Sequence, residues 1–352
     1  MFFIPGFSKG KSKKERSFAM QPILPIALLL VCASIFVNGW TDAPNAIATV
    51  VSTRVLSPRV AVVMATICNL IGITCFGSAV ASTIANLVDV GTGSSPLIAV
   101  CAAQLAIVCW SLTAWKFGIP TSESHALIAG LMGAGMAYNG LAAFKWNEFS
   151  KVLWGIFIST VIGFAASYVV TKLVGFLFRR MKRAKANRVF TIGQIFSAGM
   201  MAVSHGAQDG QKFMGVFVLV ILLAQNQPVP ETVPIAWWVM LLCSLVMAIG
   251  TSVGGYRIIK TMGIDMVKLE KYQGFSAEIV ASACMLITTI KSGIPLSTTN
   301  TKGTAMMGAG AARRFSDVNW GIAKEMVLAW VLTFPICVAL GFILTKLFIL
   351  IF

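Results

Sequence analysis

Two short segments place an aspartate next to glycine and amide side chains within a mostly apolar chain. The first, NGWTDAPN, spans residues 38–45 and contains Asp42; the second, HGAQDGQK, spans residues 205–212 and contains Asp209. Each aspartate interrupts an apolar segment, and Pro44 adds a break because proline lacks a backbone donor. Backbone carbonyls freed by a broken helix, together with a carboxylate, suit a small cation.

A second pair of segments suits an anion. GIPTSESHALIAGLMGAGMA starts at Gly118, and GIPLSTTNTKGTAMMGAGAA starts at Gly293. In each, proline stops the preceding segment, and hydroxyl residues then occupy the cap and first turn of a new helix. The unpaired N–H groups of such a helix start bind anions. We therefore expect a donor-rich site for a tetrahedral oxyanion, formed by Thr121, Ser122, Ser124, Ser297, Thr298, Thr299, Asn300 and Thr301.

These segments are repeats of one another. The hairpin segments align without gaps at an offset of 175 residues, and the aspartate segments align at a similar offset of 167. The sequence therefore predicts two halves. We divide the chain into a basic tail (1–21), a first repeat (22–178), a basic linker (179–189) and a second repeat (190–352).

The elements that must position these groups are membrane helices. Hydrophobic residues make up 57% of the chain and charged residues 11%, and apolar segments of about 20 residues recur, which is the length that spans a bilayer. The pattern predicts an all-α polytopic membrane protein of the cell membrane and lacks the alternation of a β-barrel. The expected spans are 22–37, 60–81, 97–115, 152–178, 190–203, 213–225, 235–253, 276–290 and 322–352, the last as one tilted span or a helical pair.

The positive charges mark loops on one side of the membrane. The net charge is +16, but lysine and arginine collect in short connectors such as 179–188 and 257–271, which is typical of cytoplasmic loops and argues against nucleic acid as a partner. Arg54 and Arg59 place their connector on the same side, whereas 82–96 and 225–234 lack basic residues. The two hairpin segments then enter from opposite sides, so the sequence predicts inverted-topology repeats with broken helices and paired re-entrant helical hairpins. The basic tail before the first helix conflicts with this orientation.

Other polar residues admit a structural interpretation as well as a functional one. His125 and His205 are the only histidines and lie within the repeated segments, so each is expected to transfer protons, to orient the site or to be a satisfied interior group. Lys302, Glu278 and Lys291 lie near segment ends, where they are expected to extend toward the membrane surface. The eight cysteines are expected to be packing residues.

The four segments together resemble the signatures of the inorganic phosphate transporter family of the PiT type, and they do so along nearly the whole chain. The family pattern Gly-x-Asn-Asp-x-x-Asn is similar to 39–45 and 206–212, and the hairpin segments resemble its serine-rich motifs. The resemblance implies phosphate uptake driven by a coupled cation, with an elevator-like or rocking motion. It also implies that Asp42, Asn45 and Asp209 bind the coupling cation and that the hairpin hydroxyls hold phosphate.

The chain departs from the family pattern at several positions. Thr41, expected to bind the coupling ion, and Gln208, expected to bind the substrate, stand where the pattern has asparagine. Lys212 replaces the second trailing asparagine. An ammonium cannot coordinate Na⁺, so we expect Lys212 to replace one coupling cation by pairing with Asp209 or by contacting phosphate, with Gln208 and Gln211 as neutral partners. Glu123 stands where hydroxyl residues are usual, and a carboxyl group inside a membrane can carry a proton. Proton coupling is therefore favoured over sodium coupling.

Three alternatives stay open at this point. A sulfate permease with the same fold would carry another tetrahedral anion. A membrane lipid phosphatase would use histidine and aspartate, but no HExxH segment is present. An anion channel is disfavoured because paired carboxylates select cations. The sequence predicts a transporter that is not an enzyme and has no cofactor or resident metal, and it leaves a homodimer open.

Overall fold

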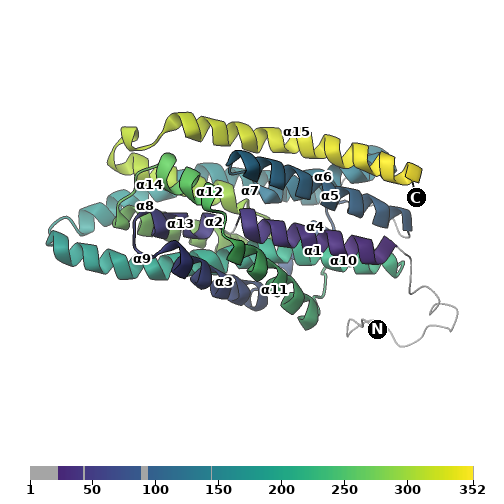
Figure 1. Ribbon diagram of the computed structural model, residues 1–352, viewed down its shortest axis with the longest axis horizontal. Coiled ribbons are helices and arrows are strands. Elements are labelled where there is room, and N and C mark those ends of the chain that lie inside the picture. The colour runs from purple at the N-terminus through teal and green to yellow at the C-terminus, as the bar shows by residue number, and fades with distance from the viewer. Residues whose placement is uncertain (1–22, 43, 89–93, 144, 352) are drawn as a thin grey trace.

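The structure is a computed structural model that describes residues 23–351 apart from 43, 89–93 and 144. The described residues form helices and no strands (Figure 1). In the first half these are α1 (Ile23–Thr41), α2 (Pro44–Ser52), α3 (Pro58–Cys75), α4 (Ala79–Ala85), α5 (Ser94–Phe117), α6 (Glu123–Asn139), α7 (Trp146–Phe157) and α8 (Gly163–Leu177). In the second half they are α9 (Arg183–His205), α10 (Gln211–Ala224), α11 (Trp237–Val253), α12 (Tyr256–Lys260), α13 (Lys271–Lys291), α14 (Thr298–Arg313) and α15 (Trp320–Ile351).

Seven of the described helices are long and apolar enough to cross a membrane, or eight with the bent pair Trp237–Val253 and Tyr256–Asp265. The polytopic all-helical architecture is therefore confirmed. The prediction of separate spans at 190–203 and 213–225 was wrong, because Arg183–Ala224 forms one helix. The five residues Gly206–Gly210 form a π-helical turn, η4, that carries the helix through the polar segment. The last segment, α15, is one helix despite Pro335.

The helix break predicted in the first half is present. The helix α1 ends at Thr41 and α2 begins at Pro44, on either side of Asp42. Proline tolerates the first position of a helix, where its missing donor is not needed. The two copies of the aspartate segment therefore share their sequence pattern but differ in backbone: the first breaks the helix and the second inserts a π-helical turn.

Each hairpin segment turns with the same local geometry. Gly118 and Gly293 adopt positive φ values of 70° and 59°, a conformation that favours glycine, and they follow the ends of α5 and α13. Ser122 and Ser297 then cap α6 and α14, accepting hydrogen bonds from the backbone N–H of His125 and Asn300. The predicted helix starts are confirmed in both copies.

The helix after each hairpin turn packs on the last helix of the other half. The helix α6 packs on α15, and α14 packs on α8. A Cβ atom at Gly133 would overlap the backbone of Val338, and one at Gly308 would overlap the backbone of Phe164. The small residues of the Gly-Ala-Gly runs thus allow close helix packing.

The helical segments that carry Asp42 and Asp209 show a second repeated contact. In the first half, Gly39 of α1 lies against the backbone of Met247 in α11. In the second half, Gly206 of the π-helical turn lies against the backbone of Asn69 in α3. Both glycines precede their aspartate by three residues, so close packing fixes the position of each carboxylate.

Replacing Gly308 by valine is expected to lower the thermal unfolding temperature clearly. The added side chain would overlap main-chain atoms of Phe164, which cannot move aside like the end of a flexible side chain, and overpacking of this kind costs about 1–3 kcal/mol. Gly175→Ala is the matched control, because its Cβ would meet only Tyr272 at an ordinary 3.8 Å. Equal unfolding temperatures of both variants in detergent would contradict the close packing.

The two ends of the bundle differ in which segments they carry. The start of α1 and the end of α15 lie at one end, and the connection from α8 to α9 lies at the opposite end (Figure 1). The basic linker and the start of α1 therefore lie at opposite ends of the bundle, which is the origin of the conflict between the two charge signals. The tail itself, residues 1–21, lies outside the described residues.

Candidate functional site

The aspartates of the two halves meet through the second hairpin. The hydroxyl of Thr298, in the first turn of α14, lies 2.9 Å from Asp42 Oδ2 and 3.2 Å from Asp209 Oδ2. Both aspartates are buried. Residues that are far apart in the sequence, from the α1–α2 break and from η4, therefore form one polar centre inside the bundle.

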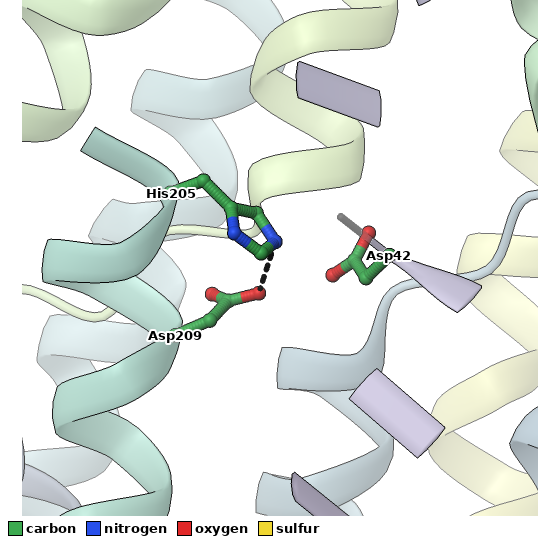
Figure 2. A group of neighbouring side chains, drawn as sticks. All are labelled: Asp42, His205 and Asp209. Atoms are coloured by element: carbon green, nitrogen blue, oxygen red, sulfur yellow. Dashed lines mark ion pairs between the residues drawn. The ribbon is translucent and has the colours of Figure 1, made fainter. Parts of the chain in front are cut away.

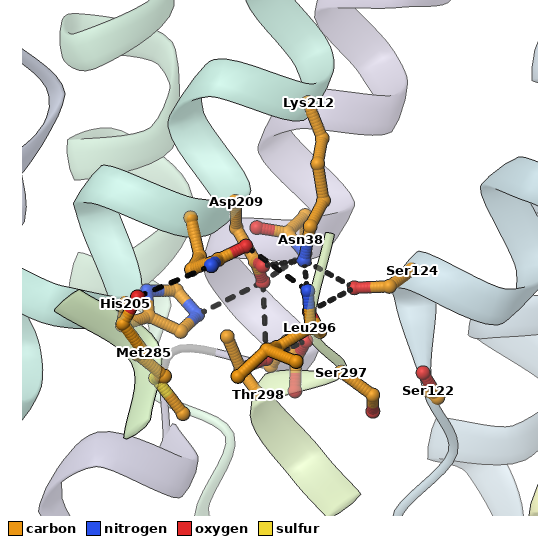
Figure 3. Close-up of polar contacts among 12 residues, drawn as sticks. Asn38, Ser122, Ser124, His205, Asp209, Lys212, Met285, Leu296, Ser297 and Thr298 are labelled. Atoms are coloured by element: carbon orange, nitrogen blue, oxygen red, sulfur yellow. Dashed lines mark hydrogen bonds and ion pairs between the residues drawn. The ribbon is translucent and has the colours of Figure 1, made fainter. Parts of the chain in front are cut away.

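Three side chains besides Thr298 surround the Asp209 carboxylate. Lys212 Nζ lies 2.7 Å from Oδ1, Asn38 Nδ2 donates to Oδ2 at 3.2 Å, and His205 Nε2 lies 3.3 Å from Oδ2 (Figures 2 and 3). His205 Nδ1 lies 3.1 Å from Asn69 Oδ1, which orients the ring toward Asp209. Two of these groups, Lys212 and His205, thus approach the Asp209 carboxyl group from its own helix.

Lys212 joins the helix of Asp209 to both hairpins. Its ammonium donates to Asp209, to Ser124 Oγ of the first hairpin at 2.5 Å and to the Leu296 carbonyl of the second hairpin at 2.5 Å (Figure 3). An ammonium has three donors, and these contacts use all of them. The side chain is only 1% exposed. A fixed positive charge therefore lies at the point where the three elements meet.

Asp42 is held mainly by its own segment and by α14. Asn45 Nδ2 donates to Asp42 Oδ1 and, at 2.9 Å, to the hydroxyl of Thr299, which itself donates to Asp42. The Thr299 hydroxyl also lies 3.0 Å from the Thr121 carbonyl of the first hairpin. This network ties the broken helix to both hairpins, and it brings two predicted coupling-ion residues, Asp42 and Asn45, next to two predicted phosphate-binding residues, Thr121 and Thr299.

The remaining hairpin residues differ in what they contact. Ser122 and Ser297 cap their helices, and Ser297 also donates to Asn300 Oδ1 at 2.9 Å. Thr301 instead bonds to the carbonyl of Ser297 at 2.7 Å, so its hydroxyl serves its own helix. Ser124 contacts Lys212. The hydroxyls that face the carboxylates come from the second hairpin, whereas the first hairpin contributes the lysine contact.

Glu123 and Thr41 form a separate contact beside this centre. The Thr41 hydroxyl lies 2.7 Å from Glu123 Oε1, and both side chains are buried. The hydroxyl links the end of α1 to the first turn of α6. Two of the predicted coupling-ion residues are therefore neighbours, although they lie 82 residues apart in the chain.

The two histidines have different surroundings. His205 lies beside Asp209, whereas the ring of His125 packs on Phe334, with 4.8 Å between ring centroids. His205 therefore has the environment of a proton-transferring or orienting group. The surroundings of His125 are those of an interior side chain between α6 and α15.

The two glutamines bond mainly to backbone groups of neighbouring segments. Gln208 Nε2 lies 3.3 Å from the carbonyls of Met285 and Ile294, and its Oε1 accepts from the Leu296 N–H at 3.2 Å. Gln211 bonds to the backbone of Phe76 and Val80 and thereby holds the segment before α4. Gln208 thus positions the second hairpin turn, and Gln211 positions another part of the bundle.

Asp42, His205 and Asp209 form a group whose candidate ligand atoms lie within 4.8 Å of one another (Figure 2). Two carboxylates and an imidazole suit a proton or a small cation, since hard cations prefer oxygen and imidazole accepts protons near neutral pH. The group brings one aspartate from each half together with the one histidine that faces them.

Sequence reasoning missed three site residues. Asn38 donates to Asp209 across the two halves, Asn69 orients His205, and Thr288 lies 3.3 Å from Gln208 Nε2. Asn38 opens the first aspartate segment, so its polar amide beside the repeat was an available signal. Asn69 and Thr288 lie within apolar spans, where no spacing pattern singles them out.

Comparison with known proteins identifies the family. The model of the phosphate transporter family matches residues 38–341, which is most of the chain and includes all four repeated segments. The chain belongs to the phosphate transporter family. Family membership confirms the predicted resemblance and identifies the chain as a multi-pass transporter of the cell membrane and not an enzyme, which removes the lipid phosphatase.

Individual relatives of this phosphate transporter family member cover it almost fully. A probable low-affinity inorganic phosphate transporter of Bacillus subtilis is 35% identical and covers 94% of this chain and 100% of its own length. A probable low-affinity inorganic phosphate transporter of Rhizobium meliloti is 40% identical, with coverage of 88% and 93%. The solved structure of a sodium-dependent phosphate transporter superposes with a TM-score of 0.85 at 24% identity, covering 94% of this chain and 100% of that chain, which shows a shared fold.

Proposed function

We propose that the chain imports inorganic phosphate by secondary active transport coupled to a cation, and that the cation is H⁺ rather than Na⁺. The Lys212 ammonium carries this proposal. It occupies the centre where Asp209, Ser124 and the Leu296 carbonyl converge, so a fixed cation already fills a position beside Asp209. The names of the family and of its relatives support phosphate as the substrate.

The proposed phosphate site lies between the starts of α6 and α14. The serine caps of both helices and the hydroxyls of the first turns supply donors. The two hairpins are neighbours, because Ser124 Oγ lies 3.3 Å from the Leu296 carbonyl. Lys212 adds positive charge from η4 and α10. The proposed phosphate-binding residues are Thr121, Ser122, Ser124, Gln208, Lys212, Ser297, Thr298, Thr299 and Asn300.

Charge balance supports coupling to a cation. Asp42, Glu123 and Asp209 are buried acidic groups, and Lys212 is the one ammonium in contact with them among the described residues. Adding a phosphate anion to this centre brings like charges together in a medium of low dielectric constant, which is strongly unfavourable. Phosphate binding should therefore require protons or cations to bind with it, at Asp42, Thr41, Asn45, Glu123 or Asp209.

The two halves are proposed to be inverted repeats that move against each other. Two repeated contacts support this proposal. Glycine contacts join α1 to α11 and η4 to α3, and each helix after a hairpin packs on the last helix of the other half, α6 on α15 and α14 on α8. The basic linker is proposed to face the cytoplasm, together with the connectors at Arg54 and Arg257.

Uptake of radiolabelled phosphate into proteoliposomes tests the proposal. An inward proton gradient without Na⁺ is expected to drive accumulation that an ionophore abolishes. Uptake that requires Na⁺ would overturn proton coupling and leave phosphate transport in place. Sulfate uptake without phosphate uptake would overturn the substrate.

Replacing Glu123 by glutamine is expected to flatten the response of uptake to pH. Glutamine keeps an oxygen for the Thr41 hydroxyl, which lies 2.7 Å from the carboxylate, but cannot release a proton. If Glu123 carries the coupled proton, a pH gradient should stimulate uptake by the variant less than about twofold. The effect of losing the group should be large, because groups that transfer protons typically contribute about a hundredfold or more to a rate. Initial rates at matched membrane potential measure this, with Glu148→Gln on α7 as control. An unchanged pH profile would contradict the role of Glu123.

A further inference from the structure

A second buried ion pair lies beside the site and was not expected. Lys302 Nζ lies 3.5 Å from Glu278 Oε1, and both side chains are 0% exposed. The sequence placed both residues near segment ends, extending toward the membrane surface; that prediction was wrong. Lys302 is in the second turn of α14 and Glu278 in α13, and the packing of α2 and α9 against these helices encloses both side chains.

Hydroxyl groups from two further helices complete this pair. Thr49 of α2 donates to Glu278 Oε1 and accepts from Lys302 Nζ at 3.0 Å. Ser197 of α9 donates to Glu278 Oε2 at 2.5 Å. Burying an ion pair in place of apolar groups brings little or no stability, and ionisable residues inside a membrane usually serve ion or substrate pathways. The stability of the fold therefore does not account for the pair.

The pair is continuous with the proposed phosphate site. Residues four apart lie on one face of a helix, so Thr49 follows Asn45 along α2, and Lys302 follows Thr298 along α14. Asn45 and Thr299 are hydrogen-bonded at 2.9 Å. One helical turn therefore separates the Lys302 ammonium from the groups that bind Asp42.

On the other side, the pair leads to an open pocket at the linker end. Thr53 lies one turn beyond Thr49, contacts Gln194 Oε1 at 2.9 Å and lines a pocket of about 870 Å³. Arg183 and Lys271 also line this pocket. Buried and half-buried polar groups thus extend from the central site, past Lys302, to a partly basic pocket beside the linker.

We infer that Lys302 is a second, transient phosphate-binding residue on the route between the central site and the linker end, and that Glu278 closes this route when phosphate is absent. In the closed state the ammonium pairs with Glu278. A phosphate anion that leaves the central site replaces Glu278 as its partner and then passes to the pocket at Arg183 and Lys271. This inference rests on the proposed phosphate transport.

The test is removal of both charges together. Lys302→Gln/Glu278→Gln keeps polar side chains at both positions and leaves no unpaired buried charge. Its matched control is Lys151→Gln/Glu148→Gln, which removes an ion pair of 2.8 Å on α7, away from the route. Losing the charge that stabilises an anion in a low-dielectric passage should slow uptake by about fiftyfold or more. Equilibrium binding of phosphate should change by less than about threefold, since the central site is intact.

The outcomes separate the inference from the function on which it rests. An absence of uptake by the wild-type protein would contradict phosphate transport itself. Wild-type uptake together with near-normal uptake by the double variant would overturn the role of Lys302. Weakened binding in step with slowed uptake would place Lys302 in the central site and also overturn the inference.

A second measurement decides the matter if the double variant does not fold. Ser197→Cys places a thiol against Glu278, where the native side chain is buried. An anionic thiol reagent added at the linker end should modify this cysteine at least about fivefold faster during phosphate transport than at rest, because the route opens only then. The buried native Cys101 serves as the internal control, with modified peptides assigned by mass spectrometry. Equal modification with and without phosphate would contradict the route.

Discussion

Phosphate uptake is expected to fall by about a hundredfold or more when Asp209 is replaced by asparagine, since loss of about 3 kcal/mol of transition-state stabilisation has this effect. The carboxylate lies 2.7 Å from Lys212 and 3.3 Å from His205, so the variant leaves a buried ammonium without its counter-charge. Breaking a buried pair in this way costs about 3–5 kcal/mol. The variant should therefore lose thermal stability as well as transport.

The double variant Asp209→Asn/Lys212→Gln distinguishes these two effects. Removing both charges should restore much of the unfolding temperature but not the uptake, since the carboxylate proposed to bind the coupling cation is still missing. Asp265→Asn, at a half-buried position paired with Lys260, is the matched control for the loss of a carboxylate. Uptake within tenfold of wild type in the single variant would contradict the central role of Asp209.

Replacing Lys212 by asparagine is expected to change the coupling ion. The ammonium occupies the position beside Asp209 and contacts Ser124 and the Leu296 carbonyl. An asparagine would remove the fixed charge and supply a neutral oxygen, the ligand that hard cations prefer. Uptake driven by a proton gradient alone should fall by about tenfold or more, and added Na⁺ should restore part of it.

Lys212→Met is the comparison that makes this result specific. Methionine removes the same charge but offers no oxygen, so Na⁺ should not restore its uptake. Initial rates in proteoliposomes with imposed proton or sodium gradients measure both variants. Loss of transport in Lys212→Asn with no change in ion dependence would contradict the idea that the lysine replaces a coupling cation.

Local signals made the hairpins predictable from the sequence. Gly118 and Gly293 adopt the positive φ that glycine favours, and Ser122 and Ser297 cap the helices that follow. Each of these features depends on a few neighbouring residues. The repeat then indicated that both copies share one geometry, and the serine and threonine residues of the site followed from it.

The continuity of the helix through Asp209 could not be predicted in the same way. Residues 204–212 are polar and rich in glycine, which lowers the local hydropathy and suggests a break. In the folded chain these polar groups bond to distant parts of the chain, as Gln208 does to the segment before α14 and Gln211 to the Phe76 carbonyl before α4. Those partners are distant in the sequence, so no local pattern reports them.

The burial of Lys302 and Glu278 was missed for a related reason. A lysine near the start of a short polar helix is usually solvent-exposed, and its sequence neighbours suggest nothing else. Its burial depends on α2 and α9, which pack over α13 and α14 from elsewhere in the chain. The charge pairing between Lys302 and Glu278 is therefore a tertiary property.

If the Lys212 ammonium replaces a coupling cation as proposed, its covalent attachment has an energetic consequence for the cell. A charge that belongs to the protein is not released with phosphate, so it takes no energy from the membrane potential in any cycle. Each mobile charge that crosses 100 mV contributes about 2.3 kcal/mol, which corresponds to about a fiftyfold accumulation ratio. A carrier with one mobile cation fewer reaches a lower phosphate gradient by this factor. Such a carrier would need fewer external cations for transport and would move less charge across the membrane in each cycle.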